Sequence, residues 1–123
     1  MRTNVPSGGP FEDRYGYSRA VRVGNQVHVS GTTARDPHLD GTDAYQQAKA
    51  ALEIVEEALR AAGSSLDAVV RTVTYVTDIG DTDLVARAHR EAFERIRPAA
   101  TLVEVSRLID PRMKVEIEVY AAD

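Results

Sequence analysis

The sequence predicts a single α+β domain in which two helices cover one face of one β-sheet. Two segments place apolar residues at helical spacing, and they are flanked by shorter segments in which apolar and polar residues alternate. The chain has 123 residues, of which 43% are hydrophobic, as expected for one domain with its own core. Taken in order, the segments predict the sequence β-β-α-β-α-β-β.

The first two strands are predicted to form a β-hairpin. Residues 1–14 are rich in proline and glycine, so we expect an irregular N-terminal arm, followed by the domain over residues 15–123. Two alternating runs then flank Gly24-Asn25, a dipeptide typical of a tight turn. The first strand should direct one set of side chains to one face, namely Tyr15, Tyr17, Arg19 and Val21.

The first helix is predicted over residues 44–63, with Thr42 or Asp43 as its N-cap and Gly63 after its last turn. A third strand begins near Val69. Its two faces should carry Val70, Thr72, Thr74 and Val76 on one side, and Val69, Arg71, Val73, Tyr75 and Thr77 on the other.

The second helix is predicted over residues 84–96, and two strands follow in "TLVEVSRL" and "KVEIEVYA". In the last strand Val115, Ile117 and Val119 should face the helices. The opposite face of the sheet is then too charged for a core and too apolar for free solvent. We therefore expect copies of the chain to associate over this face, which carries Tyr17, Arg19, Glu116, Glu118 and Tyr120.

Composition excludes several classes of function. The net charge of −4 does not favour a nucleic-acid partner, which would require a basic face. The absence of cysteine excludes disulfides, thiolate metal sites and cysteine nucleophiles. No apolar run approaches the roughly 20 residues of a membrane helix, and no secretory signal is evident. We expect a cytoplasmic protein without a membrane partner.

The polar clusters have simple structural interpretations. Asp78, Asp81 and Asp83 precede a helix, where aspartate caps the helix and favours its dipole, and their spacing is not that of a calcium loop. The three histidines lack ligand spacing, so no metal site is expected, and His89 is the one best placed to line a cleft. Glu116 and Glu118 form either a solvated or inter-subunit stripe, or a site in which one of them activates water.

The chain resembles the Rid family of imine and enamine deaminases, also called the YjgF/YER057c/UK114 family. Four pieces carry the resemblance, in family order and spacing: "GYSRAVRVGNQVHVSGTTA", "ALEIVEEALRAAGSSLDAVVRTVTYVTDI", "FERIRPAATLVEVSRL" and "KVEIEVYAAD". The resemblance implies a chorismate-mutase-like fold and a homotrimer with small-molecule clefts between subunits. It also implies hydrolysis of 2-aminoacrylate and related imines to 2-keto acids and ammonia, without a cofactor.

Family site residues carry over only in part. The resemblance implies a catalytic Glu116 that positions water, and a cleft lined by Tyr17 and by the loop at Ser30-Gly31-Thr32. Archetypal members read Pro-Ala-Arg at the mouth of the fifth strand, where the arginine holds the substrate carboxylate. This chain instead reads Pro98-Ala99-Ala100, followed by Thr101.

The missing arginine makes 2-aminoacrylate an unfavourable substrate, because a charge-assisted contact of about 1.5–3 kcal/mol is lost. Arg19, two residues after Tyr17, is a candidate replacement, although an interface ion pair with Glu116 or Glu118 is an equal alternative. The sequence thus leaves two functions open. One is hydrolysis of another imine or enamine, with Tyr17, Arg19, Gly31, Thr32, Ala100 and Thr101 binding substrate. The other is a non-catalytic, regulatory trimer that binds a small metabolite in the same clefts, or a partner protein.

Overall fold

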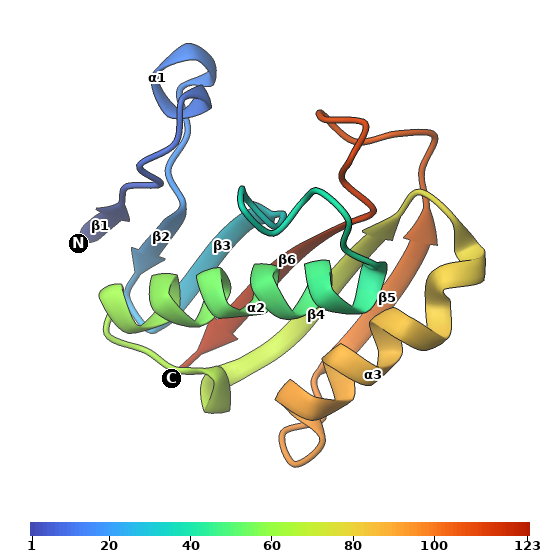
Figure 1. The fold of residues 1–123 in the computed structure, drawn as a ribbon. Helices are drawn as coiled ribbons and strands as arrows, with labels where there is room; N and C mark the ends of the chain where they lie inside the picture. Colours follow the sequence, from blue (N-terminus) through green and yellow to red (C-terminus); the bar gives the residue numbers. More distant parts are fainter.

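A six-stranded sheet with strand order β1-β2-β3-β6-β4-β5 forms the centre of the molecule, and two long helices lie across one of its faces (Figure 1). The structure is a computed structural model and describes residues 1–123. Only β4 and β5 pair in parallel; every other neighbouring pair is antiparallel. The elements are β1 (Arg2–Val5), α1 (Phe11–Tyr15), β2 (Ala20–Val23), β3 (Gln26–Thr32), α2 (Ala44–Ala61), β4 (Val69–Val76), α3 (Thr82–Phe93), β5 (Ala99–Glu104) and β6 (Val115–Ala122).

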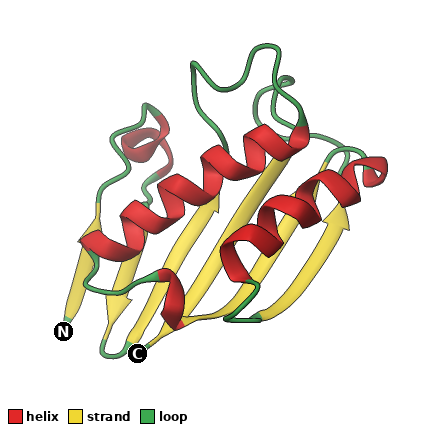
Figure 2. Cartoon of the chain, turned by 60° about the horizontal axis from the view of Figure 1, so that its bottom comes forward, coloured by secondary structure: helices red, strands yellow, loops and turns green.

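Both predicted helices and all five predicted strands are present, and the α+β class is confirmed (Figure 2). Helix α2 begins with a capping box: the Asp43 side chain accepts a hydrogen bond from Gln46 N, and the Gln46 side chain accepts one from Asp43 N. In β6, Val115, Ile117 and Val119 are buried under the helices, as the alternation predicts. None of the helices combines the length and apolar character required to cross a membrane.

The prediction of an irregular arm over residues 1–14 was wrong. Residues Arg2–Val5 form β1, which pairs with β2, and Phe11–Tyr15 form the short helix α1. The predicted first strand accordingly starts later than expected, at Ala20, and Tyr15 belongs to α1. The segment Arg2–Val5 has little strand pattern of its own, and it is ordered by the unpaired backbone edge that β2 offers.

The predicted faces of β4 were wrong at its first two residues. Val69 is 3% exposed and belongs to the core, whereas Val70 is 51% exposed. The pairing with β6 shifts register between Val69 and Arg71. One extra residue in such a bulge reverses the alternation. Thr72, Thr74 and Val76 therefore share one buried face, as predicted, but Val70 does not lie on it.

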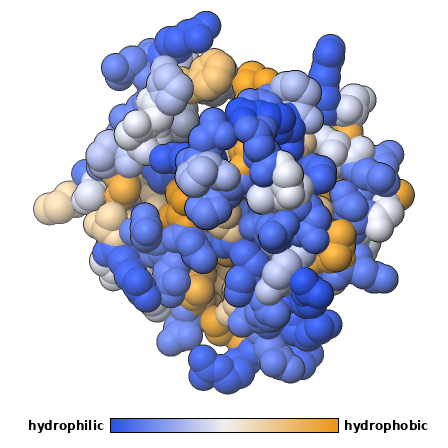
Figure 3. Space-filling model, in the orientation of Figure 1, coloured by the Kyte–Doolittle hydropathy of each residue, from blue (hydrophilic) through white to orange (hydrophobic).

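The two sides of the molecule differ in character. The helix side, viewed in Figure 3, is mostly hydrophilic with scattered apolar spots, as suits a surface in water. The uncovered sheet face instead carries a mixed cluster in which Glu118 accepts hydrogen bonds from Tyr75, at 2.6 Å, and from Tyr120. This contact with Glu118 raises the pKa of Tyr75 to about 12. The mixed face predicted from the alternation is therefore present.

Candidate functional site

The carboxylate of Glu116 lies directly against the backbone of Gly31. Ser30 and Gly31 lie between Val29 and Thr32 in β3, whereas only Glu118 lies between their partners Val119 and Ile117 in β6. Strand β3 therefore carries one extra residue at this point. A Cβ atom at Gly31 would lie 2.6 Å from Glu116 Oε2 and 2.9 Å from its Cδ. Glycine at position 31 is thus what allows the carboxylate to occupy this place.

Burial shapes the acidity of Glu116. Loss of contact with water raises its pKa above the ordinary glutamate value, the charge of Glu118 raises it further, and the nearby charge of Arg19 lowers it. A carboxylate that is partly desolvated is a stronger base than one in water. Glu116 is therefore suited to accept a proton from a water molecule.

Arg19 is a buried cation at the entry to β2. Its backbone is fixed on both sides, by Arg19 N donating to Val5 O and by Ser30 N donating to Arg19 O. The side chain is 7% exposed; it donates to Thr32 Oγ1 at 3.0 Å and to Gly31 O at 3.1 Å. Burial lowers the pKa of Arg19, and its Nε has no hydrogen-bond partner.

Arg19 forms no salt bridge within the chain, and its predicted ion pair with Glu116 or Glu118 across an interface stays a prediction. The guanidinium instead lies 5.5 Å from the centre of the Tyr17 ring. Tyr17 lines a shallow cleft of about 560 Å³ beside β1 and α1, together with Glu12, Asp13 and Ser30. Thr32 is fully buried, and its hydroxyl donates to Ser30 O while accepting from Arg19. Thr32 therefore positions Arg19.

We call Tyr17, Arg19, Gly31, Thr32 and Glu116 the Glu116 half-site. Ala100 and Thr101 are not part of it. They line a different cleft, of about 490 Å³, between α3 and β5, together with His89. The expectation that His89 lines a cleft is confirmed by its place in this one. Its Nε2 lies 2.8 Å from Thr72 Oγ1, and burial lowers the pKa of the His89 ring.

The Glu116 half-site and the α3–β5 cleft lie on opposite faces of the sheet. Ala100 is level with Thr72 in β4, and Thr72 contacts His89 on the helix side. Glu116 is level with Tyr75, whose side chain points to the uncovered face. One chain therefore does not bring all of the predicted site residues together.

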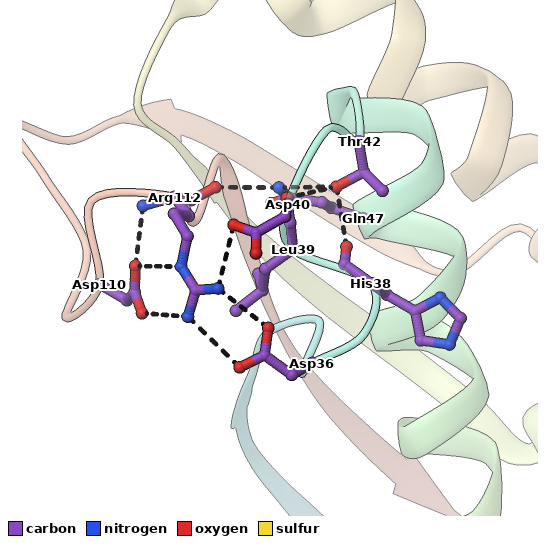
Figure 4. Close-up of polar contacts among 8 residues, drawn as sticks. All are labelled: Asp36, His38, Leu39, Asp40, Thr42, Gln47, Asp110 and Arg112. Atoms are coloured by element: carbon purple, nitrogen blue, oxygen red, sulfur yellow. Dashed lines mark hydrogen bonds and ion pairs between the residues drawn. The ribbon is translucent and has the colours of Figure 1, made fainter.

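Arg112 holds the loop over residues 33–43, which follows β3 and its half-site residues Gly31 and Thr32 (Figure 4). Its guanidinium forms ion pairs with Asp36, Asp40 and Asp110, at 2.9, 3.2 and 2.8 Å. These contacts tie the segment after β3 to the segment before β6, so that both approaches to Glu116 are held in place.

Gln47, fully buried in α2, extends this network. Its amide donates to Thr42 Oγ1 and Arg112 O (Figure 4). Its side-chain oxygen accepts a hydrogen bond from Lys114 N. Both the loop after β3 and the segment before β6 are thereby anchored to the helix.

Sequence reasoning did not identify Arg90 and Arg97, which also line the α3–β5 cleft. The available signal was the position of Arg97 immediately before Pro98, at the mouth of β5.

The acids predicted as helix caps serve that purpose in part, because Asp78 accepts a hydrogen bond from Gly80 N whereas Asp81 forms no cap bond. No group of three or more histidine or acidic side chains suited to a metal ion is present.

Comparison with known proteins identifies the family. The family described as Endoribonuclease L-PSP matches residues 11–123. A crystal structure of a YjgF/YER057c/UK114 family member from Mycobacterium tuberculosis superimposes with a TM-score of 0.94 at 47% identity, and covers 100% of both chains. The chain belongs to the YjgF/YER057c/UK114, or Rid, family. The resemblance drawn from the sequence is therefore confirmed.

Other members of the family extend the comparison. An uncharacterized protein of Streptomyces coelicolor is 41% identical over 119 residues, which span 95% of this chain and 89% of that protein. The 2-iminobutanoate/2-iminopropanoate deaminase of Homo sapiens is 33% identical over 109 residues, which span 85% of this chain and 78% of the human protein. The family therefore includes proteins named for imine deamination.

Proposed function

We propose that this chain hydrolyses a reactive imine or enamine to a carbonyl compound and ammonia. The observation that carries the proposal is the partly desolvated carboxylate of Glu116, packed on Gly31 and close to the cation of Arg19. A base of this kind is what the addition of water to a C=N bond requires. The named activity of the human relative supports the same reaction class.

The reaction uses one water molecule and needs no electron acceptor. Glu116 accepts a proton from water while the oxygen adds to the imine carbon, and the electron pair of the C=N bond moves to nitrogen. The proton held by Glu116 then passes to nitrogen. The hydroxyl proton of this carbinolamine next passes through the Glu116 carboxylate to the amine nitrogen. As the C–N bond breaks, ammonia leaves and the carbinol oxygen becomes the carbonyl oxygen.

Arg19 assists as a positioning residue. Its charge opposes the rise in the pKa of Glu116 and so favours the ionised form of the carboxylate, which is the form that accepts a proton. Its contacts with Thr32 Oγ1 and Gly31 O fix the loop on which the carboxylate rests. We do not assign to it the carboxylate contact of the archetype, because both terminal nitrogens of Arg19 already donate, to Thr32 Oγ1 and to Gly31 O.

We further propose that the protein acts as a homotrimer with a small molecule bound between subunits. The separation of the Glu116 half-site from the α3–β5 cleft supports this arrangement, since a neighbouring subunit can present its cleft to the Glu116 of the first. The mixed face around Glu118 is a suitable contact surface. Sedimentation equilibrium tests this proposal, and a monomer at micromolar concentration would contradict it.

Ala100 favours a second candidate, a non-catalytic trimer that binds a small metabolite, because the chain lacks the archetypal carboxylate contact at this position. A coupled assay separates the two functions. Amino-acid oxidase generates imines from a panel of amino acids, and semicarbazide captures the imine that remains. The enzymatic function is supported if the wild-type protein speeds the loss of imine and the Glu116→Gln variant does not. Unchanged imine levels across the panel would overturn it in favour of binding.

A further inference from the structure

The α3–β5 cleft combines an apolar floor with a cationic rim. Val85, Phe93 and Leu102 form the floor, while Arg90 and Arg97 lie at the rim with one acid, Glu94. A volume of about 490 Å³ is within the range of small-molecule sites. The small side chain of Ala100 leaves this space open.

Arg97 has an unusual backbone. Its φ of 55° makes it the single non-glycine residue of the chain in the left-handed region. Arg97 N donates to Phe93 O at 2.9 Å, which closes the last turn after α3 in the way that glycine usually does. An arginine here is less favourable than glycine, so the backbone conformation does not explain the residue.

The guanidinium of Arg97 is held in place by one hydrogen bond, but no acidic side chain pairs with its charge. Its Nε donates to Glu94 O at 3.0 Å, and neither terminal nitrogen forms a hydrogen bond or an ion pair. Two parallel N–H groups of arginine match the two oxygens of a carboxylate.

His89 limits the charge deeper in the cleft. Burial lowers its pKa, so the ring is neutral at physiological pH, and it packs 4.7 Å from the ring of Phe93. The interior therefore suits an uncharged, apolar group, whereas the rim suits an anion.

We propose that Arg97, assisted by Arg90, binds the carboxylate of a substrate whose side chain is apolar and larger than the methylene of 2-aminoacrylate. The arginine that the family archetype carries at position 100 is thus replaced from the turn before β5. The assignment of the ligand as a substrate rests on the proposed imine hydrolysis, whereas the binding site itself does not.

The test uses 2-oxo acids, which are stable products of such a reaction. Titration calorimetry on the full chain compares 4-methyl-2-oxopentanoate with pyruvate and with 4-methylpentan-2-one, which lacks the carboxylate. We expect 4-methyl-2-oxopentanoate to bind at least about tenfold more tightly than either of the other two compounds. In NMR spectra of the same titration, the amide signals that shift should belong to α3 and β5. Equal affinity for pyruvate, or for the ketone, would overturn the proposal.

Arg97→Gly provides the decisive variant, with Arg95→Ala as its control. Glycine suits the left-handed backbone, so we expect the Tm to stay or rise while affinity for 4-methyl-2-oxopentanoate falls at least about tenfold. Arg95→Ala removes the same charge from an exposed residue outside the cleft and should leave affinity unchanged. Unchanged affinity in Arg97→Gly, or an equal loss in Arg95→Ala, would contradict the role of Arg97.

Turnover separates the two proposals. If the wild type binds 4-methyl-2-oxopentanoate through Arg97 but hydrolyses no imine, the proposed reaction fails and the binding site stands. If the wild type hydrolyses imines and Arg97→Gly is unaffected in KM, the reaction stands and the role of Arg97 fails.

Discussion

Replacing Gly31 with alanine should displace the carboxylate of Glu116 without unfolding the protein. The added Cβ would lie 2.6 Å from Glu116 Oε2, whereas non-bonded heavy atoms attract best at about 3.5–4.0 Å, so the carboxylate must move by about 1 Å. The atoms in the way are the end of a flexible side chain, and the φ of Gly31 is not positive. We therefore expect the free energy of unfolding to change by no more than about 1 kcal/mol.

The functional effect of Gly31→Ala should be much larger, because misplacement of a reacting group by about 1 Å can cost about 100-fold in rate. The coupled imine assay measures this loss. An NMR titration of the Glu116 carboxyl should show its pKa falling toward the ordinary glutamate value as the group moves toward water.

Gly9→Ala is the matched control for Gly31→Ala, since its Cβ would meet only Ser7 Oγ, at 3.5 Å. We expect it to leave both turnover and the pKa of Glu116 unchanged. If Gly31→Ala also left both unchanged, the packing of Glu116 on Gly31 would not be what sets its reactivity.

Three further variants test the surroundings of the site. Because burial raises the pKa of Glu116, the folded state binds this proton more tightly, and stability declines as pH rises from the ordinary glutamate value through the raised one. Glu116→Gln should abolish turnover. It should also flatten the decline of the unfolding free energy with pH, measured by urea unfolding at several pH values. An unaltered dependence of stability on pH would show that the pKa of Glu116 is not raised in the folded protein. Gln47→Leu strands Lys114 N and Arg112 O, and should cost about 2–4 kcal/mol in urea unfolding. A cost below about 1 kcal/mol would show that water replaces these bonds. Arg112→Ala should speed amide exchange across residues 33–43 while changing the Tm little, because its partners are largely exposed. Uniform exchange changes throughout the chain would argue against a local role.

The sequence predicted features that depend on local pattern. Alternation in β6 separates buried Ile117 from Glu116, and the cap at Asp43 is a short-range motif. The pairing of Arg2–Val5 with β2 and the bulge at Val70 could not be predicted, because both depend on the edge or the partner that another segment supplies.

The candidate site divides in the same way. Resemblance located Glu116 and Gly31 as single residues, but their contact depends on an extra residue in β3 that only pairing with β6 reveals. The left-handed backbone of Arg97 was not predictable, since this conformation has no sequence signature at a residue before proline. The cleft that it lines forms only when α3 packs beside β5.

Mixing two inactive variants tests most directly whether one working site needs the Glu116 of one subunit and the α3–β5 cleft of another. Glu116→Gln removes the base, and Ala100→Trp fills the cleft. In randomly mixed trimers each site draws its halves from different subunits, so the mixture should recover about a quarter of wild-type turnover. A mixture that stays as inactive as either variant alone, once exchange of subunits is shown, would contradict a shared site.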